Sequence, residues 1–285
     1  YAAKEGGRNR FQFFDSSMAC RLQERFALEA GMRRGLAHGA FHVHFQPQID
    51  ARTHTIMGME ALLRWDDPEM GSIAPTKFIP VAEETGLILE LGEFVFREAL
   101  QFSQHLQTEG LPPIRVAVNL SSVQMLDPQL LERIEYCIAL TGADPHNLEV
   151  EVTESVLLEG SGQALATLNR MKELGITLAL DDFGTGYSSL SYLHQYPFDI
   201  LKIDQSFVQA LSGASQGRNL ATAIIAMGKS LGMELIAEGV EDLDQANFLL
   251  ARGCHKAQGF LYGHPMSPTD FRAFYWDRVG GEPKS

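Results

Sequence analysis

The fold of this chain is decided by Leu178-Ala-Leu-Asp-Asp-Phe-Gly-Thr-Gly-Tyr-Ser-Ser-Leu190, in which a short apolar run leads into two adjacent carboxylates, Asp181 and Asp182. An apolar run of this length, bounded by Gly184 and Gly186, is typical of a buried strand that carries both carboxylates at its carboxyl end. Because unpaired charges near a core are costly, the pair indicates a bound divalent cation. The alternative is that both aspartates cap the following helix or face water.

Composition restricts the kinds of partner. The 285 residues hold 23 Lys and Arg against 36 Asp and Glu, a formal charge of −13, which argues against binding long nucleic acid. Three distant cysteines, Cys20, Cys137 and Cys254, form no metal-ligand spacing and favour reduced thiols in the cytoplasm. No apolar run reaches the ~20 residues that span a bilayer. We therefore expect no membrane contact from this segment, and any anchor would lie elsewhere in the parent protein.

Helical and extended patterns alternate along the chain. Period-two patterns and short apolar runs predict eight strands, at Phe41–Gln48, Ile56–Trp65, Arg115–Leu120, Leu148–Thr153, Ile176–Asp182, Asp199–Asp204, Glu234–Ala237 and Lys256–Phe260. Helical spacing predicts helices at Met18–Ala37, Phe78–Gly86, Leu91–Leu106, Asp127–Leu140, Gly162–Leu174, Arg218–Leu231, Leu243–Ala251 and Thr269–Trp276, with a short helix before Tyr196. Asp127 is the expected N-cap of its helix, and the segment from Trp65 to Pro80 is an expected loop.

The alternation favours an α/β fold, a (β/α)8 TIM-like barrel. Only a few residues join the first two strands, too few for the right-handed helical crossover that parallel pairing requires. We therefore predict that the first two strands are antiparallel.

Every predicted strand carries a polar residue in or near its carboxyl-terminal part, where this architecture places its chemistry. These residues are Gln46, Glu60, Asn119, Glu151, Asp181 with Asp182, Lys202, Glu238 and Gln258. The alternative for any one of them is a buried polar group that satisfies the backbone. Eight such positions together favour a functional ring.

Strand periodicity indicates which side chains share a face. Glu60, Leu62 and Arg64 lie on one face of their strand, so Glu60 and Arg64 either form an ion pair or hold a metal and a phosphate side by side. Glu149 and Glu151 alternate with valines and are expected to point inward. Lys202 lies between buried apolar neighbours and needs an acidic partner.

The acidic members of the ring, with one amide, offer only oxygen ligands, which favours Mg²⁺ or Mn²⁺ over zinc. This ligand set is Glu60, Asn119, Glu151, Asp181, Asp182 and Glu238. Five carboxylates exceed what one divalent ion neutralises, so we expect two ions that share a bridging carboxylate, Asp181. Adjacent strand residues point in opposite directions, and we expect Gly184 and Gly186 to bend the chain so that Asp181 and Asp182 converge.

A set of motifs in fixed order resembles the EAL family of cyclic di-GMP phosphodiesterases over roughly Leu22 to Trp276. The motifs are Glu60-Ala-Leu62, Asn119-Leu-Ser121, Glu151-Val-Thr-Glu-Ser155, Asp181-Asp-Phe-Gly-Thr-Gly-Tyr-Ser-Ser-Leu190, Lys202-Ile-Asp204, Glu238-Gly-Val-Glu241 and Gln258-Gly-Phe260. The resemblance implies metal-dependent hydrolysis of cyclic di-GMP to linear pGpG by a water that bridges two metal ions.

The resemblance also assigns roles to individual residues. It places one metal on Glu60, Asn119, Glu151 and Asp181, and the second on Asp181, Asp182 and Glu238. It implies catalytic roles for Lys202, Glu238 and Glu154, substrate contacts from Gln46, Leu62, Arg64, Asp199 and Gln258, and support of the metal site by Glu241. The Asp181–Leu190 loop and the helix after it resemble the family's dimerisation element, so a homodimer is expected.

Residues 1–17 resemble the end of a GGDEF diguanylate cyclase domain with its linker, and residues 18–285 the EAL phosphodiesterase domain. We therefore expect an upstream GGDEF domain and a sensor domain in the parent protein. Two alternatives to catalysis are a catalytically silent cyclic di-GMP receptor and a regulatory or dimerisation module for the upstream cyclase. Receptors of this family usually lack a ligand residue, and here none is missing.

Overall fold

The computed structural model describes residues 16–154, 156, 161–184, 195–212 and 215–280. The chain divides into two compact units, residues 1–41 with 65–87 and residues 42–64 with 88–285. The expected GGDEF remnant and the Thr185–Leu190 part of the expected dimer loop lie outside the described residues, as does most of the short helix predicted before Tyr196.

The first unit contains α2 (Ser16–His38), the last residues of β2 (Thr55–Asp67), β3 (Gly71–Ile73) and α3 (Pro75–Thr85). Its centre is the buried Trp65, which stacks on Phe41 at 5.3 Å and meets Phe78 edge-on at 5.5 Å. The predicted loop from Trp65 to Pro80 is wrong, because it contains β3 and the first half of α3. Proline at the first helical position is compatible with a helix, and α3 begins at Pro75.

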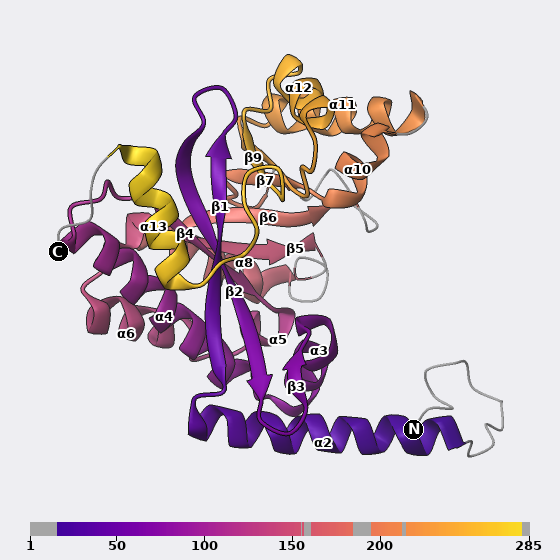
Figure 1. The fold of residues 1–285 in the computed structure, drawn as a ribbon, viewed down its shortest axis with the longest axis vertical. Helices are drawn as coiled ribbons and strands as arrows, with labels where there is room; N and C mark the ends of the chain where they lie inside the picture. The colour runs from indigo at the N-terminus through magenta and orange to yellow at the C-terminus, as the bar shows by residue number, and fades with distance from the viewer. Residues whose placement is uncertain (1–15, 155, 157–160, 185–194, 213–214, 281–285) are drawn as a thin grey trace. The chain divides into compact units, whose positions relative to one another are not determined.

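The second unit is a closed barrel of eight strands (Figure 1). These are β1 (Phe41–Asp50), β2, β4 (Arg115–Leu120), β5 (Leu148–Thr153), β6 (Thr177–Phe183), β7 (Ile200–Ile203), β8 (Glu234–Ala237) and β9 (Lys256–Gln258). Neighbours from β2 through β4 to β9 pair in parallel, whereas β1 pairs with β9 antiparallel and with β2 to close the ring. The predicted α/β barrel with its first two strands antiparallel is therefore confirmed.

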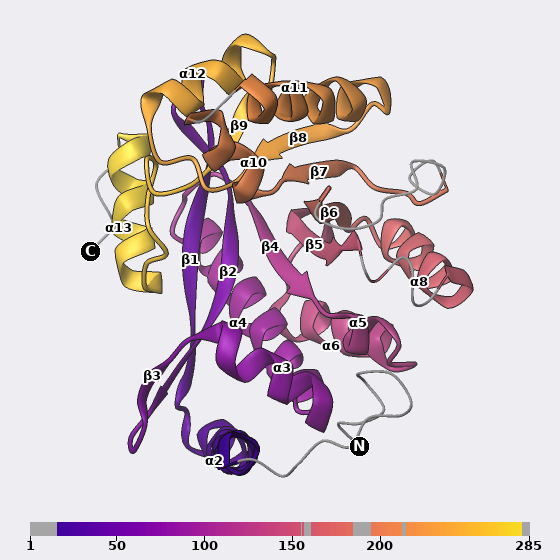
Figure 2. The same ribbon diagram turned by 90° about the vertical axis from the view of Figure 1, so that its right-hand side faces the viewer.

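Helices cover the strands on the outside. They are α4 (Ile88–Thr108), α5 (Ser122–Met125), α6 (Leu130–Thr141), α8 (Ser161–Glu173), α10 (Gln205–Gln209), α11 (Ser215–Ser230), α12 (Leu243–Ala251) and α13 (Pro268–Val279), with short 3₁₀ turns at Pro145–Asn147 and Ala210–Ser212. Figure 2 shows α11 lying along β8. The one-turn helices α5 and α10 were not predicted. Asp127 precedes α6 rather than capping it, and accepts the backbone N–H of Gln129 at 3.0 Å.

In β4 and β5, valines that face the helices alternate with residues that face the barrel interior. Val116, Val118, Val150 and Val152 are fully buried in the core beneath the helices. The opposite face of these strands carries the polar residues of the ring. Because successive side chains of a strand point to opposite faces, the apolar and the charged side chains lie in separate layers. Within the described part of the chain, no helix is long and apolar enough to cross a membrane.

Candidate active site

The site begins with side chains brought together by strand register. Asn119 on β4 lies opposite Glu151 on β5, and Thr153 lies opposite Asp181 on β6, which sets successive polar residues side by side at the carboxyl ends of the strands. Asn119 Nδ2 donates to Glu60 Oε1 at 2.6 Å. Two members of the predicted ligand set, Asn119 on β4 and Glu60 on β2, are thus in contact.

Lys202 on β7 lies at the centre of this cluster. Its side chain is fully buried, and Nζ lies 2.6 Å from Glu238, 2.7 Å from Glu151 and 3.5 Å from Asp181. Burial by itself would lower the pKa of Lys202, but the surrounding carboxylates raise that pKa well above its usual value. The predicted acidic partner of Lys202 is confirmed, and three carboxylates serve instead of one.

The cluster holds more negative charge than Lys202 can balance. Burial raises the pKa of Glu151 well above its usual range, and the neighbouring carboxylates raise it further. Burial likewise raises the pKa of Glu238 to about 8. Glu60 is the contrast, because Lys202 and the amides of Gln258 and Asn119 lower its pKa against the effect of burial. Burial is thus the main cause of the raised carboxyl pKa values, and repulsion between the carboxylates adds to it.

Asp182 reaches the cluster through a bend in β6. Its φ of 54° is left-handed, and the pairing of β6 with β7 shifts register between Leu180 and Phe183. Carboxylate oxygens of Asp181, Asp182 and Glu238 consequently lie within 4.8 Å of one another. The bend thus begins at Asp182 itself, before Gly184, where we had not predicted it; aspartate is among the residues that tolerate this conformation.

A cavity of ≈ 370 Å³ opens beside the carboxylates. Gln46, Leu62 and Gln258 line it, and their substrate contacts stay a prediction. Gln258 Nε2 donates to Gln46 Oε1 at 2.9 Å and to Glu60 Oε2 at 2.5 Å, so the amides are fixed to the carboxylate ring.

Several lining residues were not predicted. They are Gln205, Gly239, Gly259, Phe260 and Pro265. Phe260 is 54% exposed and stacks on His264 with ring centroids 4.1 Å apart. Each of these residues lies just after a strand or in the loop that follows β9. This position at the carboxyl end of the barrel could have identified them from the sequence.

Asp204 was also missed. It follows β7, is buried, and accepts the Ser206 backbone N–H at 3.0 Å as the N-cap of α10. Burial raises the pKa of Asp182, and the charges of Asp181 and Asp204 raise it further.

Asp199 is not part of the site. It precedes β7 at the amino end of the strand, where both carboxylate oxygens accept from Lys172 Nζ at 2.7 Å and one accepts the Leu178 N–H at 2.8 Å. The structure does not place it with the other predicted substrate contacts, because the start of a parallel strand lies at the end of the barrel opposite its carboxyl terminus.

Three predicted site residues remain, Arg64, Glu241 and Glu154. Arg64 is half-buried on β2, where burial lowers the pKa of its guanidinium and Glu60 counteracts that effect. Glu241 lines the cavity, and its backbone N–H donates to Gln245. Glu154 is buried directly after β5, and its carboxylate accepts no hydrogen bond from any described residue.

The donor set fits a divalent cation. Five carboxylates, those of Glu60, Glu151, Asp181, Asp182 and Glu238, face the single ammonium of Lys202. Both oxygens of Glu151 are buried without a hydrogen bond from the described residues, although one is ion-paired with Lys202. Clustered carboxylate and amide oxygens are the ligands that Mg²⁺ and Mn²⁺ prefer.

Comparison with known proteins agrees with this geometry. The family model described as the EAL domain matches residues 29–265. The chain is 39% identical over 266 residues to the bifunctional diguanylate cyclase/cyclic di-GMP phosphodiesterase MucR of Pseudomonas aeruginosa, covering 93% of this chain and 39% of that protein. It is 38% identical over 275 residues to the cyclic di-GMP phosphodiesterase PdeR of Escherichia coli, covering 96% and 41%.

A solved structure described as the PaMucR phosphodiesterase in a c-di-GMP complex is 37% identical, with a TM-score of 0.83 over 86% of this chain and 99% of that one. The chain thus spans about two fifths of the length of the two curated relatives and nearly all of the solved phosphodiesterase domain. Since the family model spans most of the chain and the barrel and its ring of carboxylates agree with it, this chain belongs to the EAL domain family.

Proposed function

We propose that this protein is a phosphodiesterase that hydrolyses cyclic di-GMP to linear pGpG. The observation that carries the proposal is the ring of carboxylates around Lys202 at the mouth of a cavity. The names of the relatives MucR and PdeR and the cyclic di-GMP complex of the PaMucR domain support this choice of substrate.

Two divalent cations, Mg²⁺ or Mn²⁺, match the charge of the ring. Five carboxylates opposite one ammonium leave four negative charges, which two such cations would balance. The first cation would be held by Glu60, Asn119, Glu151 and Asp181, and the second by Asp181, Asp182 and Glu238. When bound, the cations supply the positive charge that makes water a nucleophile at neutral pH and stabilises charge on the phosphate.

In the reaction, a water oxygen bonds to phosphorus while the bond from phosphorus to the ribose 3′ oxygen breaks. The 3′ oxygen takes up a proton, and the product keeps a 5′ phosphate. We assign Lys202 to position or deprotonate the attacking water, because its Nζ lies within 3.5 Å of three proposed metal ligands, Glu151, Asp181 and Glu238. Its ion pairs with Glu151 and Glu238 also hold those ligands in place.

The remaining residues would hold the substrate. Gln46, Leu62 and Gln258 line the cavity, and Arg64 extends the face of β2 that carries Glu60. We assign Arg64 to a phosphate of the substrate. Glu154 would steady the loop after Asp182, and Glu241 the metal site from the edge of the cavity.

The proposal is tested by incubating the protein with cyclic di-GMP and Mg²⁺ or Mn²⁺ and following the products by chromatography and mass spectrometry. We expect linear pGpG in the presence of either cation and none in EDTA. No turnover with either cation, from protein that is folded by circular dichroism, would contradict the proposal. Tight binding by calorimetry without product would then support a cyclic di-GMP receptor.

We further propose that the domain works in the cytoplasm as a homodimer, within a longer protein that carries GGDEF and sensor domains upstream. The bifunctional description of MucR supports the GGDEF partner. Sedimentation of the chain at several concentrations tests the dimer, and a monomer throughout would exclude it for this segment. Removing the EAL domain from the parent protein and measuring cyclase output would show whether the domain also regulates the cyclase.

A further inference from the structure

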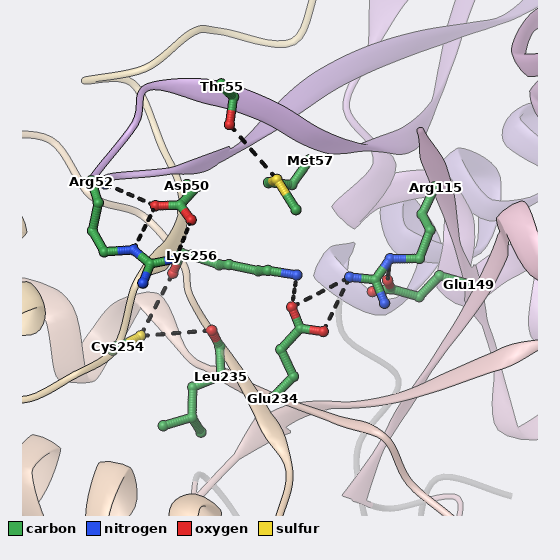
Figure 3. A network of polar contacts seen from close by, with 10 residues as sticks. All are labelled: Asp50, Arg52, Thr55, Met57, Arg115, Glu149, Glu234, Leu235, Cys254 and Lys256. Carbon is green, nitrogen blue, oxygen red and sulfur yellow. Dashed lines mark hydrogen bonds and ion pairs between the residues drawn. The ribbon is translucent and has the colours of Figure 1, made fainter. Parts of the chain in front are cut away.

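A second cavity lies at the opposite end of the barrel from the carboxylate ring. It has a volume of ≈ 220 Å³, and its charged and titratable lining residues are Asp50, Arg52, Lys229, Glu234, His255 and Lys256. Glu234 begins β8 and Lys256 begins β9, and Lys256 lies opposite Asp50 at the end of the reversed strand β1. We call it the amino-end cavity; Figure 3 shows four of these residues.

Both carboxylates of this cavity are already engaged. Asp50 accepts from Arg52 Nε at 3.1 Å, from Arg52 Nη2 at 2.6 Å and from the Arg52 backbone N–H at 2.9 Å. Glu234 is shared between Lys256 and Arg115, whose Nη2 lies 3.3 Å away (Figure 3). Their negative charge is therefore used within the wall of the cavity.

Lys229 is not paired with either of these carboxylates. Its Nζ donates to the backbone carbonyl of Arg252 at 2.5 Å, and it has no carboxylate within salt-bridge distance among the residues that the structure covers. Gly253 lets the chain pass close to this ammonium, because a Cβ there would lie 2.1 Å from Lys229 Nζ. The ammonium is thus held at the edge of the cavity by a backbone carbonyl.

Two further features indicate unused capacity for an anion. His255 Nδ1 is buried and has no hydrogen-bond partner in the described part of the chain. Burial and the neighbouring charge of Arg115 lower the pKa of Lys256 to about 8, although Lys256 also touches Glu234. Arg115 and the cavity's Arg52, Lys229 and Lys256 carry four positive charges, against three negative charges on Asp50, Glu149 and Glu234. One positive charge is therefore in excess here.

We propose that the amino-end cavity binds a small phosphate-bearing anion through Lys229, His255 and Lys256. Four basic side chains line this cavity together with two engaged carboxylates, although the whole chain carries a charge of −13. A water occupies about 30 Å³ of liquid, so the cavity has room for a phosphate or pyrophosphate group. Several oxygens on one phosphorus would reach cations that come from α11 and β9.

The test is calorimetric titration of the metal-free chain with inorganic phosphate and with pyrophosphate, at constant ionic strength. We expect saturable binding of at least one probe, weakened at least tenfold in Lys229→Met. Lys229 is on the exposed side of α11, so this variant should fold, and Lys229→Arg should keep most of the affinity. Lys77→Met is the matched control, because it removes the same charge from an exposed lysine of α3 and should bind as the wild type does.

Arg64→Ala separates this site from the substrate cavity. A phosphate held in the amino-end cavity is insensitive to Arg64, whereas one held in the substrate cavity would lose affinity in that variant. The proposal is overturned by three results: no saturable heat with either probe, unchanged affinity in Lys229→Met, or binding that is lost in Arg64→Ala.

Discussion

Lys202 shows how single residues define this site. A buried lysine is costly unless it is paired, and here carboxylates from β5, β6 and beyond β8 surround it at 2.6–3.5 Å. Three carboxylates surround one ammonium, so the cluster around Lys202 keeps a net negative charge. The chemistry of the site thus follows from one cation and its excess of partners.

Replacing Lys202 by Met should destabilise the metal-free protein. Removing one partner of a buried ion pair leaves the other charge buried and uncompensated, which costs roughly 3–5 kcal/mol. We therefore expect the free energy of unfolding, measured in urea, to fall by about that amount. Lys172→Met is the control, since its partner Asp199 and its own side chain are one-third or more exposed and exposed pairs contribute about 0–1 kcal/mol. Equal losses in both variants would contradict the central role of Lys202.

Asp181→Ala should abolish turnover, because both proposed cations lose a ligand. The loss of kcat should exceed the ~10–100-fold that removal of an outer-shell partner causes. Asp199→Ala makes the same chemical change at the other end of the barrel and should leave kcat and KM near their wild-type values. Steady-state kinetics of the two variants decide the matter, and wild-type kcat in Asp181→Ala would refute the shared ligand.

The pKa of Lys256 predicts a pH dependence of stability. The folded pKa of about 8 lies below the ordinary lysine pKa of 10.5, so between these values the unfolded chain binds more protons than the folded one. Stability contributed at this residue therefore rises as pH increases from 8 towards 10.5. The difference between urea midpoints of wild type and Lys256→Met should grow in favour of the wild type over this window. A difference independent of pH would exclude the lowered pKa.

At the scale of elements, the bend in β6 is what joins two neighbouring aspartates into one site. A regular strand would point Asp181 and Asp182 in opposite directions, and the left-handed φ of Asp182 removes that alternation. Position 182 therefore has a left-handed backbone conformation, which glycine, asparagine and aspartate adopt more readily than other residues.

This conformation predicts different results for two substitutions at position 182. Asp182→Asn removes the charge but tolerates a left-handed backbone, so activity should fall while the urea midpoint stays near that of the wild type. Asp182→Val should lose activity and also stability, by about 1–2 kcal/mol for a left-handed L-residue. Denaturation curves of the two variants test this, and equal midpoints would show that the backbone at this position relaxes freely.

The sequence predicted the elements with strong periodicity and missed those without it. β4, β5, β8 and α12 have the predicted bounds, since each is a regular apolar pattern between turn residues. α5 and α10 are single turns, too short to show a period, and β3 is a three-residue strand. The convergence of Asp181 and Asp182 was predicted from the glycines that follow them. The position of the bend at Asp182 was not, because the register shift lies in the pairing with β7. Asp199 was assigned by resemblance, whereas its place at the start of β7 put it at the other end of the barrel.

At the scale of the whole molecule, divalent cations should link catalysis to stability. A ligand that binds only the folded state at a hundred times its Kd stabilises it by about 2.7 kcal/mol. Mg²⁺ or Mn²⁺ should therefore raise the thermal midpoint of the wild type, and EDTA should reverse the increase. Asp181→Ala should show little of it. A midpoint that does not respond to either cation would contradict a metal site in the ring.

The reversed first strand affects how the chain must be made. β1 pairs with β9 through Gln48 and Gln258, which are separated by most of the sequence. During synthesis β1 and β8 therefore remain open strand edges until residues 256–258 emerge from the ribosome, and open edges invite wrong pairing. Because Gln258, which closes the ring, also binds Glu60, the last strand to arrive completes both the barrel and the catalytic pocket. Closure of the barrel and completion of the pocket therefore depend on the same late segment of the chain.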